Sequence, residues 1–411
     1  MNRSFLLLQG MCTPYFSLLG KALSEHGHAV HKVNFNGGDA LYWRAGKALA
    51  YRGNQDEAAA FYADAFKQTG ATDLVLFGDC RPLHLPAIDL AERTGVRVHV
   101  FEEGYFRPYW VTLERHGVNA RSRLPRDPDW YREAGRAVPD YGNGEAFESS
   151  FWIRAWHDVA YHIGNISNPL FYPNYCTHAP VTAPVEYLAY LRRALILPRA
   201  ARLDAQTIAK LAFHKRRFWL LPLQLNSDAQ IKVHSPFDDM FEVIEHTIAS
   251  FAKAAPPSDY LIIKNHPLDT GLCNYAKHID TVGQKFGIAP RVVYLETGHL
   301  PTLLNHARGV VTVNSTVGGS ALVHSRPTIA LANAIYNMPG LTFQGSLDDF
   351  WLSAEPPDPA LFTDFRNVVI HTTQLNGGFY SRSGMHMAIR NSLPRLTAER
   401  SPLEALASDL R

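Results

Sequence analysis

The feature that most constrains the fold of this chain is a run of short apolar segments that alternate with helix-like segments. In the first hundred residues the apolar segments of strand length are 5–9, 31–35, 73–77 and 96–101. The segments between them with helical character are 15–25, 43–68 and 85–93. Strands that alternate with helices predict parallel βαβ units with helices on both faces of a sheet. The amino-terminal half is therefore expected to be Rossmann-like.

A second series of strand-like segments begins near residue 217 and repeats this pattern. Its members are 218–223, 260–264, 291–294, 309–313 and 328–330, with helix-like segments at 240–254 and 300–306. A chain of 411 residues is too long for one ordinary core, so about two domains are expected. We therefore predict an α/β protein in which two Rossmann-like domains face a cleft. This is the plan of the B-type glycosyltransferase fold, and a likeness of plan carries no chemistry by itself.

The expected domain boundaries follow from where the two series stop. Residues 1–210 form the first predicted domain, and residues 211–358 form the second. Within the first, about 127–210 is rich in Trp, Tyr and Pro and is expected to be a helical insertion. Residues 359–411 are expected to be helices that pack back on the first domain.

Composition limits the partners and the compartment. A formal net charge of +2 gives no electrostatic case for a nucleic-acid partner. The four cysteines are scattered without a CxxC pair, which predicts neither a zinc site nor a disulfide framework and fits a reducing cytoplasm. His and Asp never recur at the spacing of metal ligands, so no metal is expected. No segment approaches the roughly 18–20 apolar residues needed to span a bilayer, so any membrane contact is expected to be peripheral.

The last apolar segment of the first series runs into two adjacent carboxylates. Glu102 and Glu103 follow it in VHVFEEGYFRP (98–108), and Gly104 ends the strand. Open α/β sheets bind ligands at the carboxyl ends of their strands. Because neighbouring side chains on a strand point to opposite sides, at most one of the two acids is expected to face a cleft, where a general base would lie. The alternative is a solvated pair close to Arg107.

Polar side chains also follow the first strand of the second series. The loop PLQLNSDAQIKVHSP (222–236) contains Gln224 and Asp228. Amides and a carboxylate in such a loop suit hydrogen bonds to a base or a ribose. An Asx-type turn that merely organises the loop is the alternative.

The next strand ends in IIKNHPLD (262–269), where His266 follows the apolar run. Pro267 stiffens the turn behind it, and Lys264 lies nearby. A histidine held there suits a phosphate, either to bind it or to assist its departure. A lone histidine is more often a structural hydrogen-bonding residue.

The strongest local signal of phosphate recognition is GVVTVNSTVGGSAL (309–322). An apolar strand leads into Asn314, Ser315 and Thr316, and two glycines open a helix-like segment. Small hydroxyls and backbone N–H groups at a helix amino terminus make an anion site, while simple helix capping is the alternative. The chain contains neither GxGxxG nor GxxxxGK[ST], so it carries no dinucleotide fingerprint and no P-loop.

Taken together, these segments resemble the bacterial capsule polysaccharide β-Kdo transferases, where Kdo is 3-deoxy-D-manno-oct-2-ulosonic acid. The resemblance covers most of the chain from residue 5 to about 340, and it is nearest to the single-domain type that starts the linker on a lipid. The motifs that carry it are VNFNGGDALYWR (33–44), VLFGDCRPLH (75–84), VHVFEEGYFRPYWVTLE (98–114), PLQLNSDAQIKVHSPF (222–237), IKNHP (263–267) and VNSTVGGSAL (313–322).

The resemblance implies a reaction and a donor. In this family Kdo passes from CMP-β-Kdo to an acceptor and the β linkage is retained. The first domain would bind the acceptor, and the second would bind the CMP-sugar without a cofactor or a metal. The family's acid-acid-glycine motif falls on Glu102, Glu103 and Gly104, with Glu103 standing where the related extending enzymes have Asp. Glu103 is thus the first choice for the catalytic acid and Glu102 the second.

The family's donor-site motifs fall on the loops of the second domain. The His-Pro motif matches His266 and Pro267, and the serine/threonine motif matches Ser315 and Thr316; both are expected at the CMP phosphate. The glutamine motif matches Gln224, although Leu225 replaces the proline of the extending enzymes. The remaining residues expected to line the donor site are Lys264, Asp228 and Asn314.

The acceptor implied by the resemblance is lysophosphatidylglycerol or a related phospholipid, and transfer to it would start the poly-Kdo linker of a capsule. This implies a cytoplasmic protein, peripheral on the inner membrane and in contact with other capsule assembly proteins. Candidate membrane contacts are Trp43 with Arg44, the aromatic segment 152–175, and HKRR at 214–217. Two alternatives stay open: a transferase for another CMP-sugar, such as a sialyltransferase, and a non-catalytic capsule assembly or export component.

Overall fold

A computed structural model describes residues 2–177, 181–213 and 217–410, and these residues form two compact units. The first unit contains 2–124, 133–177 and 366–410. The second contains 125–132, 181–213 and 217–365. Two helices, α5 (Pro128–Arg136) and α15 (Pro359–Thr373), continue from one unit into the other.

The described residues of the first unit are built on a seven-stranded sheet of order β12-β6-β5-β4-β1-β2-β3. The strands from β5 to β3 run parallel, whereas β6 is antiparallel to both β5 and β12. Four strands were predicted from the sequence; β3, β6 and β12 were not. The strand bounds are β1 (Ser4–Leu7), β2 (Ala29–Asn34), β3 (Leu49–Ala50), β4 (Asp73–Phe77), β5 (Arg97–Glu103), β6 (Trp110–Arg115) and β12 (Gln374–Asn376).

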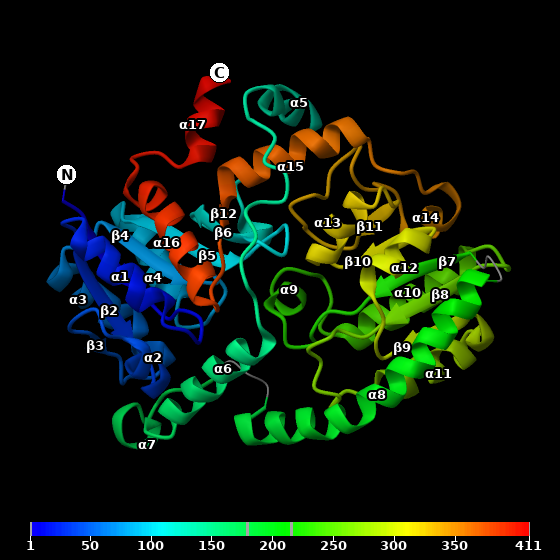
Figure 1. Cartoon of the computed structure of the whole chain (residues 1–411), viewed down its shortest axis with the longest axis horizontal. Coiled ribbons are helices and arrows are strands. Elements are labelled where there is room, and N and C mark those ends of the chain that lie inside the picture. Colours follow the sequence, from blue (N-terminus) through cyan, green and yellow to red (C-terminus); the bar gives the residue numbers. More distant parts are fainter. Residues whose placement is uncertain (1, 178–180, 214–216, 411) are drawn as a thin grey trace. The chain divides into compact units, whose positions relative to one another are not determined.

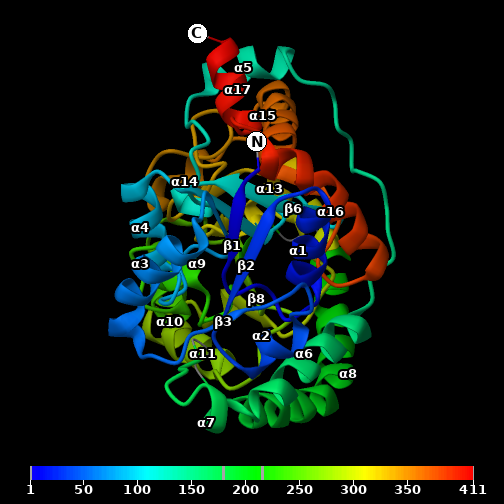
Figure 2. The same ribbon diagram turned by 90° about the vertical axis from the view of Figure 1, so that its left-hand side faces the viewer.

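Helices cover both faces of this sheet, because consecutive strand residues are apolar and their side chains point alternately to opposite sides. Helices α1 and α16 pack on one face and α3 and α4 on the other (Figures 1 and 2). The helix bounds are α1 (Tyr15–Glu25), α2 (Gly37–Tyr42), α3 (Ala58–Thr69), α4 (Leu85–Thr94), α6 (Phe151–Asn165), α7 (Asn168–Phe171), α16 (Arg382–Thr397) and α17 (Pro402–Asp409), with 3-10 turns η1 (Gln55–Glu57) and η2 (Asn119–Arg121).

The helix expected over 43–68 is wrong in its first half. A short strand, β3, and a turn occupy that part, and α3 begins only at Ala58. The physical reason is a local competitor: the Asn54 side chain accepts hydrogen bonds from the backbone N–H groups of Asp56 and Glu57, and this capping starts a new helical segment there.

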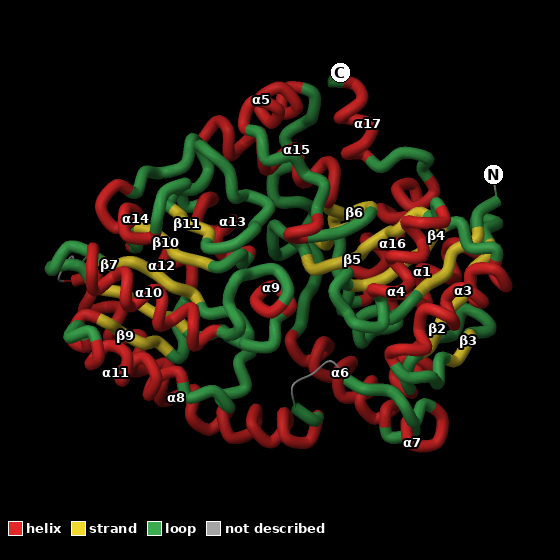
Figure 3. Tube along the Cα trace, turned by 180° about the vertical axis from the view of Figure 1, so that it is seen from behind, coloured by secondary structure: helices red, strands yellow, loops and turns green. Residues whose placement is uncertain are grey.

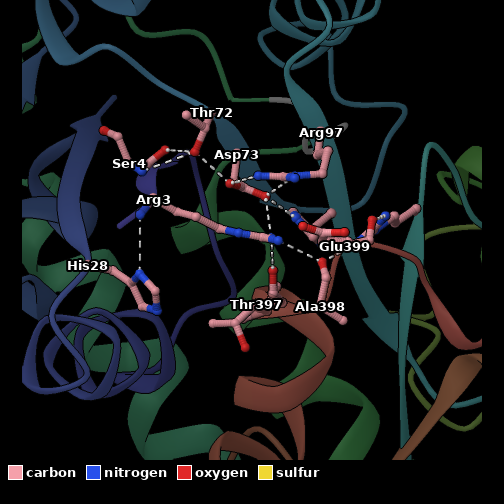
Figure 4. Close-up of polar contacts among 12 residues, drawn as sticks. Arg3, Ser4, His28, Thr72, Asp73, Arg97, Thr397, Ala398 and Glu399 are labelled. Atoms are coloured by element: carbon pink, nitrogen blue, oxygen red, sulfur yellow. Dashed lines mark hydrogen bonds and ion pairs between the residues drawn. The ribbon is translucent and has the colours of Figure 1, made fainter. Parts of the chain in front are cut away.

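The buried carboxylate of Asp73 links β4 to β5 near the amino-terminal ends of these strands (Figure 4). Asp73 is fully buried and accepts a two-pronged ion pair from Arg97, at 2.8 and 2.9 Å, and a 2.8 Å hydrogen bond from Nε2 of His99. Arg3 lies 3.6 Å from the same carboxylate and donates to the backbone oxygens of Leu396 and Ala398. Burial alone would raise the pKa of Asp73, but the hydrogen bonds from His99 and Arg97 outweigh it and hold that pKa well below its ordinary value.

The described residues of the second unit are built on a five-stranded sheet of order β11-β10-β7-β8-β9, all parallel. Figure 3 shows its strands between helices on both sides. The strand bounds are β7 (Phe218–Pro222), β8 (Tyr260–Lys264), β9 (Val292–Leu295), β10 (Gly309–Thr312) and β11 (Thr328–Ala330). The helices are α8 (Ala183–Phe213), α9 (Ala229–Lys232), α10 (Met240–Ala254), α11 (Tyr275–Lys285), α12 (Leu300–His306), α13 (Thr316–Val323) and α14 (Leu347–Ser353), with the turn η3 (Ala289–Arg291).

The α/β class with two Rossmann-like units and a helical insertion is confirmed. That the two sheets face one cleft stays a prediction. The expected domain boundary at residue 210 would place the whole insertion in the first unit. The structure instead places α8 in the second unit. Its side chains Ile208 and Leu211 join the core around Leu220 and Leu304 of that unit. The final segment divides as well: 359–365 lies in the second unit and 366–410 in the first.

Candidate functional site

The two acids of the FEEG segment lie inside β5 rather than beyond it. Glu102 pairs with Thr112 and Glu103 with Val111 of the antiparallel strand β6. Both carboxylates are half-buried at the carboxyl end of the strand. Gly104 then passes so close to β6 that a Cβ atom would lie 2.0 Å from the backbone oxygen of Trp110, so only glycine fits this turn.

The two acids point to different sides, as alternation along a strand predicts. Glu102 lies beside the β4 loop, where an ideal Cβ on Gly78 would be 3.5 Å from its Oε2. Glu102 also accepts a 2.9 Å hydrogen bond from the backbone N–H of Glu103. The Oε1 atom of Glu103 instead accepts a 3.0 Å hydrogen bond from the hydroxyl of Tyr380.

Tyr380 and Arg154 form the immediate surroundings of Glu103. The guanidinium of Arg154 on α6 lies 4.6 Å from the centre of the Tyr380 ring. Burial, followed by the charge of Glu103, raises the pKa of Tyr380 above its ordinary value, so its hydroxyl keeps its proton and donates. This contact fixes one oxygen of Glu103, which is what a catalytic carboxylate needs. Sequence reasoning missed both residues, because they lie far from Glu103 along the chain.

A cavity of about 180 Å³ with polar and apolar walls lies in the same unit, beside the ends of β1, β2 and β4. Its wall includes Gln9, Arg81 and Tyr175. Arg81 donates to the side-chain oxygen of Gln9 at 2.9 Å. The Gln9 amide donates in turn to the hydroxyl of Tyr161 on α6 at 3.1 Å, and Tyr161 donates to Asp39 at 3.0 Å. A guanidinium and amides around a cavity suit a polar, anionic ligand.

The NGGD segment explains how α6 packs closely against α2. Asn36 caps α2, and Gly37 and Gly38 allow α6 to approach closely. A Cβ on Gly37 would lie 2.1 Å from the backbone oxygen of Gly164, and a Cβ on Gly38 would lie within 2.7 Å of the Tyr161 ring. Glycine is therefore required at both positions by packing.

In the second unit, the predicted donor residues lie at the carboxyl ends of three neighbouring strands. Gln224 follows β7 and Asn314 follows β10, and the structure joins them through a 3.1 Å hydrogen bond from the Gln224 amide to Asn314. The Asn314 amide donates to the backbone oxygen of Gln230 at 2.8 Å. Asp228 caps the short helix α9 by accepting from Gln230. These contacts hold the 222–236 loop against the start of α13.

Helix α13 begins in the NST segment as expected. Ser315 is the capping residue, and its hydroxyl accepts from the backbone N–H of Val317; Thr316 is the first residue of the helix. The buried hydroxyl of Tyr336 donates to the backbone oxygen of Ser315 at 2.5 Å. A Cβ on Gly318 would lie 2.1 Å from that same hydroxyl oxygen, so glycine leaves room for Tyr336 beneath the start of the helix.

His266 follows β8, the neighbour of β7 on the other side. Its Nδ1 accepts a 3.1 Å hydrogen bond from the backbone N–H of Leu268, so the neutral ring carries its proton on Nε2. The ring is therefore oriented with Nε2–H as its donor, the form that suits a phosphate oxygen. Pro267 follows directly, in the turn that this hydrogen bond closes.

Lys264 occupies a different environment from His266. Its side chain is buried and its ammonium donates to the backbone oxygen of Asn265 at 2.9 Å. Burial, followed by the charge of Arg193, lowers the pKa of Lys264. Lys264 therefore contacts the backbone just before the His-Pro turn. Among the described residues, it makes no hydrogen bond to Ser315 or Thr316.

A buried ion-pair network that sequence reasoning missed supports the His-Pro turn from α8. Arg193 lies 2.8 Å from Glu296 and donates to the backbone oxygen of His266 at 3.4 Å. The Asn265 amide donates to Glu296 at 3.2 Å, and its oxygen accepts from the backbone N–H of His266 at 2.8 Å. The spacing of charged residues gave no signal for this network, since its members come from three distant segments.

The candidate membrane contacts differ in exposure. Trp43 is buried in the core of the first unit beside α1, whereas Trp152 and Trp156 on α6 are 79% and 67% exposed. Residues 214–216 of the HKRR segment lie outside the described residues. Within the described part of the chain, every helix is either too short or too polar to cross a bilayer.

Fold and site together define an α/β protein with two Rossmann-like units, one presenting paired acids at a strand end and the other presenting a histidine, hydroxyls and amides at three strand ends. The chain belongs to the capsule polysaccharide biosynthesis protein family, whose model matches residues 72–380. This confirms the predicted resemblance to capsule polysaccharide proteins.

Relatives match nearly the whole chain. The capsule polysaccharide export protein KpsS of Escherichia coli is 36% identical over 385 residues, which are 92% of this chain and 97% of that protein. The capsule polysaccharide modification protein LipB of Neisseria meningitidis serogroup B is 35% identical over 386 residues, 92% of each chain. A solved structure of KpsC from Thermosulfurimonas dismutans, a β-Kdo 2,7 transferase, is 13% identical, covers 95% of this chain and 98% of that chain, and superposes with a TM-score of 0.44.

Proposed function

We propose that this protein is a glycosyltransferase that moves Kdo from CMP-β-Kdo to lysophosphatidylglycerol or a related phospholipid, and so starts the poly-Kdo linker of a capsular polysaccharide. The observation that carries the proposal is the placement of the family's motif residues. Glu103, His266 and Ser315 each stand at the carboxyl end of a strand, where α/β proteins bind their ligands. Membership of a capsule biosynthesis family supplies the biological setting.

The second unit would hold the CMP moiety. Nε2–H of His266, the hydroxyls of Ser315 and Thr316 and the first N–H groups of α13 would contact the phosphate. A CMP-sugar carries a single phosphate, so these donors suffice and neither a metal nor a cofactor is required. Gln224, Asn314 and Asp228 would hold the loop that faces the nucleoside, and Lys264 and Pro267 would support the His-Pro turn.

The first unit would supply the catalytic acid. In one role, the Glu103 carboxylate attacks the anomeric carbon of Kdo as the bond to the CMP oxygen breaks, and the acceptor hydroxyl then displaces Glu103 and gives its proton to the phosphate of the released CMP. In the other role, Glu103 removes the proton of the acceptor hydroxyl while the hydroxyl oxygen bonds to the anomeric carbon on the face from which CMP departs, so that the β linkage is retained. The Tyr380 hydroxyl would hold one carboxylate oxygen in both roles.

The acceptor is expected to approach the first unit from a membrane surface. The exposed tryptophans of α6 support a peripheral location on the inner membrane, because indole rings favour the boundary between water and lipid. The cavity beside Arg81 and Gln9 offers donors for the polar head of a phospholipid. Other capsule assembly proteins would receive the product.

The test is mass spectrometry of reactions that contain lysophosphatidylglycerol and either CMP-Kdo or CMP-sialic acid. We expect a lipid product heavier by one Kdo residue with CMP-Kdo and no product with CMP-sialic acid. Transfer from CMP-sialic acid instead would identify a sialyltransferase-like enzyme. The word export in the name of the Escherichia coli relative favours a second candidate, a non-catalytic assembly component. CMP binding without turnover on any lipid would support that candidate and exclude ours.

A further inference from the structure

Helix α8 of the second unit has two faces of different chemistry. The inner face is buried and includes Ala189, Arg193, Asp204 and Leu211, which contact the rest of the unit. The outer face carries large apolar side chains whose exposed fractions lie between 51% and 85%. They are Leu188, Leu191, Leu195, Ile196 and Leu203. A soluble helix normally presents polar residues on this side, so the outer face indicates an interaction surface.

The charged residues of α8 are segregated in the same way. Arg192, Arg199, Arg202 and Lys210 are exposed, and at 100° per residue they fall with the five apolar side chains within an arc of about 140°. The two acids of the helix, Glu186 and Asp204, lie on the opposite side, where Asp204 accepts from Thr297. The outer face therefore combines apolar surface with four positive charges and contains no acid.

This combination identifies the occupant by charge complementarity. Leucine and isoleucine side chains enter the boundary of a bilayer, while arginine heads reach the phosphates above it. Anionic phospholipids attract such cations, with a gain in binding of about fivefold for each arginine. We propose that the outer face of α8 docks this protein on a bilayer surface rich in anionic phospholipid. The proposal rests on the peripheral location proposed above and assigns it a surface that the sequence motifs did not indicate. Figure 1 shows the course of α8.

The test uses the full chain in flotation assays with two kinds of vesicle, phosphatidylglycerol mixed with phosphatidylethanolamine and phosphatidylcholine alone. We expect binding to the first kind and little to the second. The triple variant R192Q/R199Q/R202Q should bind phosphatidylglycerol vesicles about 100-fold more weakly, whereas R192K/R199K/R202K should stay within about fivefold of the parent protein. The double variant L188S/L195S should lose at least about tenfold.

Matched controls come from other exposed positions of the same unit. Leu352→Ser on α14 removes an exposed apolar side chain, and Lys277→Gln on α11 removes an exposed positive charge. Both lie outside α8 and should leave vesicle binding unchanged. Circular dichroism checks that each variant is folded. Equal binding of the parent protein to both kinds of vesicle would overturn the assignment. So would control variants that lose binding while the α8 variants keep it.

Two further measurements separate this inference from the proposed reaction and from self-association. Transfer to an acceptor dispersed in detergent should be unchanged in the α8 variants, because the surface acts only on bilayer docking. Vesicle binding without any transfer would remove the proposed function and leave the docking surface standing. Sedimentation that shows a dimer disrupted by the α8 variants, together with no vesicle binding, would make a second copy of the chain the occupant and refute the proposal.

Discussion

Two adjacent glycines at the start of α13 provide a matched pair for testing the construction of the candidate phosphate site. An ideal Cβ on Gly318 would lie 2.1 Å from the hydroxyl oxygen and 2.4 Å from Cζ of Tyr336, a side chain that is only 4% exposed. An ideal Cβ on Gly319 meets nothing within 4 Å. The two substitutions Gly318→Ala and Gly319→Ala are chemically identical, so the difference between them isolates the contact with Tyr336.

The two substitutions are expected to change the free energy of unfolding in opposite directions. Either alanine favours the helix by about 0.5–1 kcal/mol because it reduces the freedom of the unfolded chain. At Gly318 the buried Tyr336 ring must also move, which costs about 1–3 kcal/mol. Its hydrogen bond to Ser315 is strained or lost, which costs about 0.5–1.5 kcal/mol more. We expect Gly318→Ala to lower the free energy of unfolding of the second unit by about 0.5–4 kcal/mol and Gly319→Ala to raise it by about 0.5–1 kcal/mol.

Urea unfolding followed by tryptophan fluorescence measures this difference, since Trp219 and Trp351 are fully buried in the core of the same unit. Calorimetric titration with CMP gives the second readout. Gly318→Ala should weaken CMP binding about tenfold, because Tyr336 positions Ser315 at the start of the helix. Equal stability of the two variants, or unchanged CMP affinity in Gly318→Ala, would refute the role given to Tyr336.

Three further predictions concern single contacts. Tyr380→Phe removes the hydrogen bond to Glu103 while keeping the ring, and it should lower kcat about 10–100-fold with little change in the KM for CMP-Kdo in steady-state kinetics. Asp73→Asn removes the charge that pairs with the buried Arg3 and the half-buried Arg97 and should cost about 3–5 kcal/mol in urea unfolding. Because the folded pKa of Asp73 is lowered, its contribution is present above the unfolded pKa of about 3.9 and is lost as the pH falls below it, so the parent protein should lose stability more steeply than the variant under acid. Asn314→Ala breaks the link to Gln224 and should raise the Kd for CMP about tenfold in calorimetry.

Most of the parallel framework could be predicted from the sequence, because its signals are local. Segments such as 73–77 and 240–254 show their strand or helix character within a few residues, and the structure has elements at those positions. The antiparallel strands β6 and β12 gave no comparable signal. β12 has three residues and pairs with β6 from more than 250 residues away, so no local pattern could indicate it.

The residues of the candidate site also differ in whether a local sequence pattern indicates them. Residues that directly follow apolar strands, such as His266 and Ser315, could be found from the sequence, because strand ends place ligand-binding groups. Tyr380 and Arg193 could not, since each meets its partner only after distant segments have packed. The α8 boundary was missed for a related reason: the burial of Arg193 and Leu211 depends on which sheet the helix contacts.

The central claim is that Glu103 carries out Kdo transfer. Its most direct test compares Glu103→Gln with Glu102→Gln in transfer from CMP-Kdo to lysophosphatidylglycerol, with CMP affinity measured on the same preparations. We expect Glu103→Gln to lose about 10²–10⁴-fold in kcat with CMP binding unchanged, and Glu102→Gln to stay within about tenfold of the parent protein. Transfer by Glu103→Gln at a rate near that of the parent protein would contradict the claim.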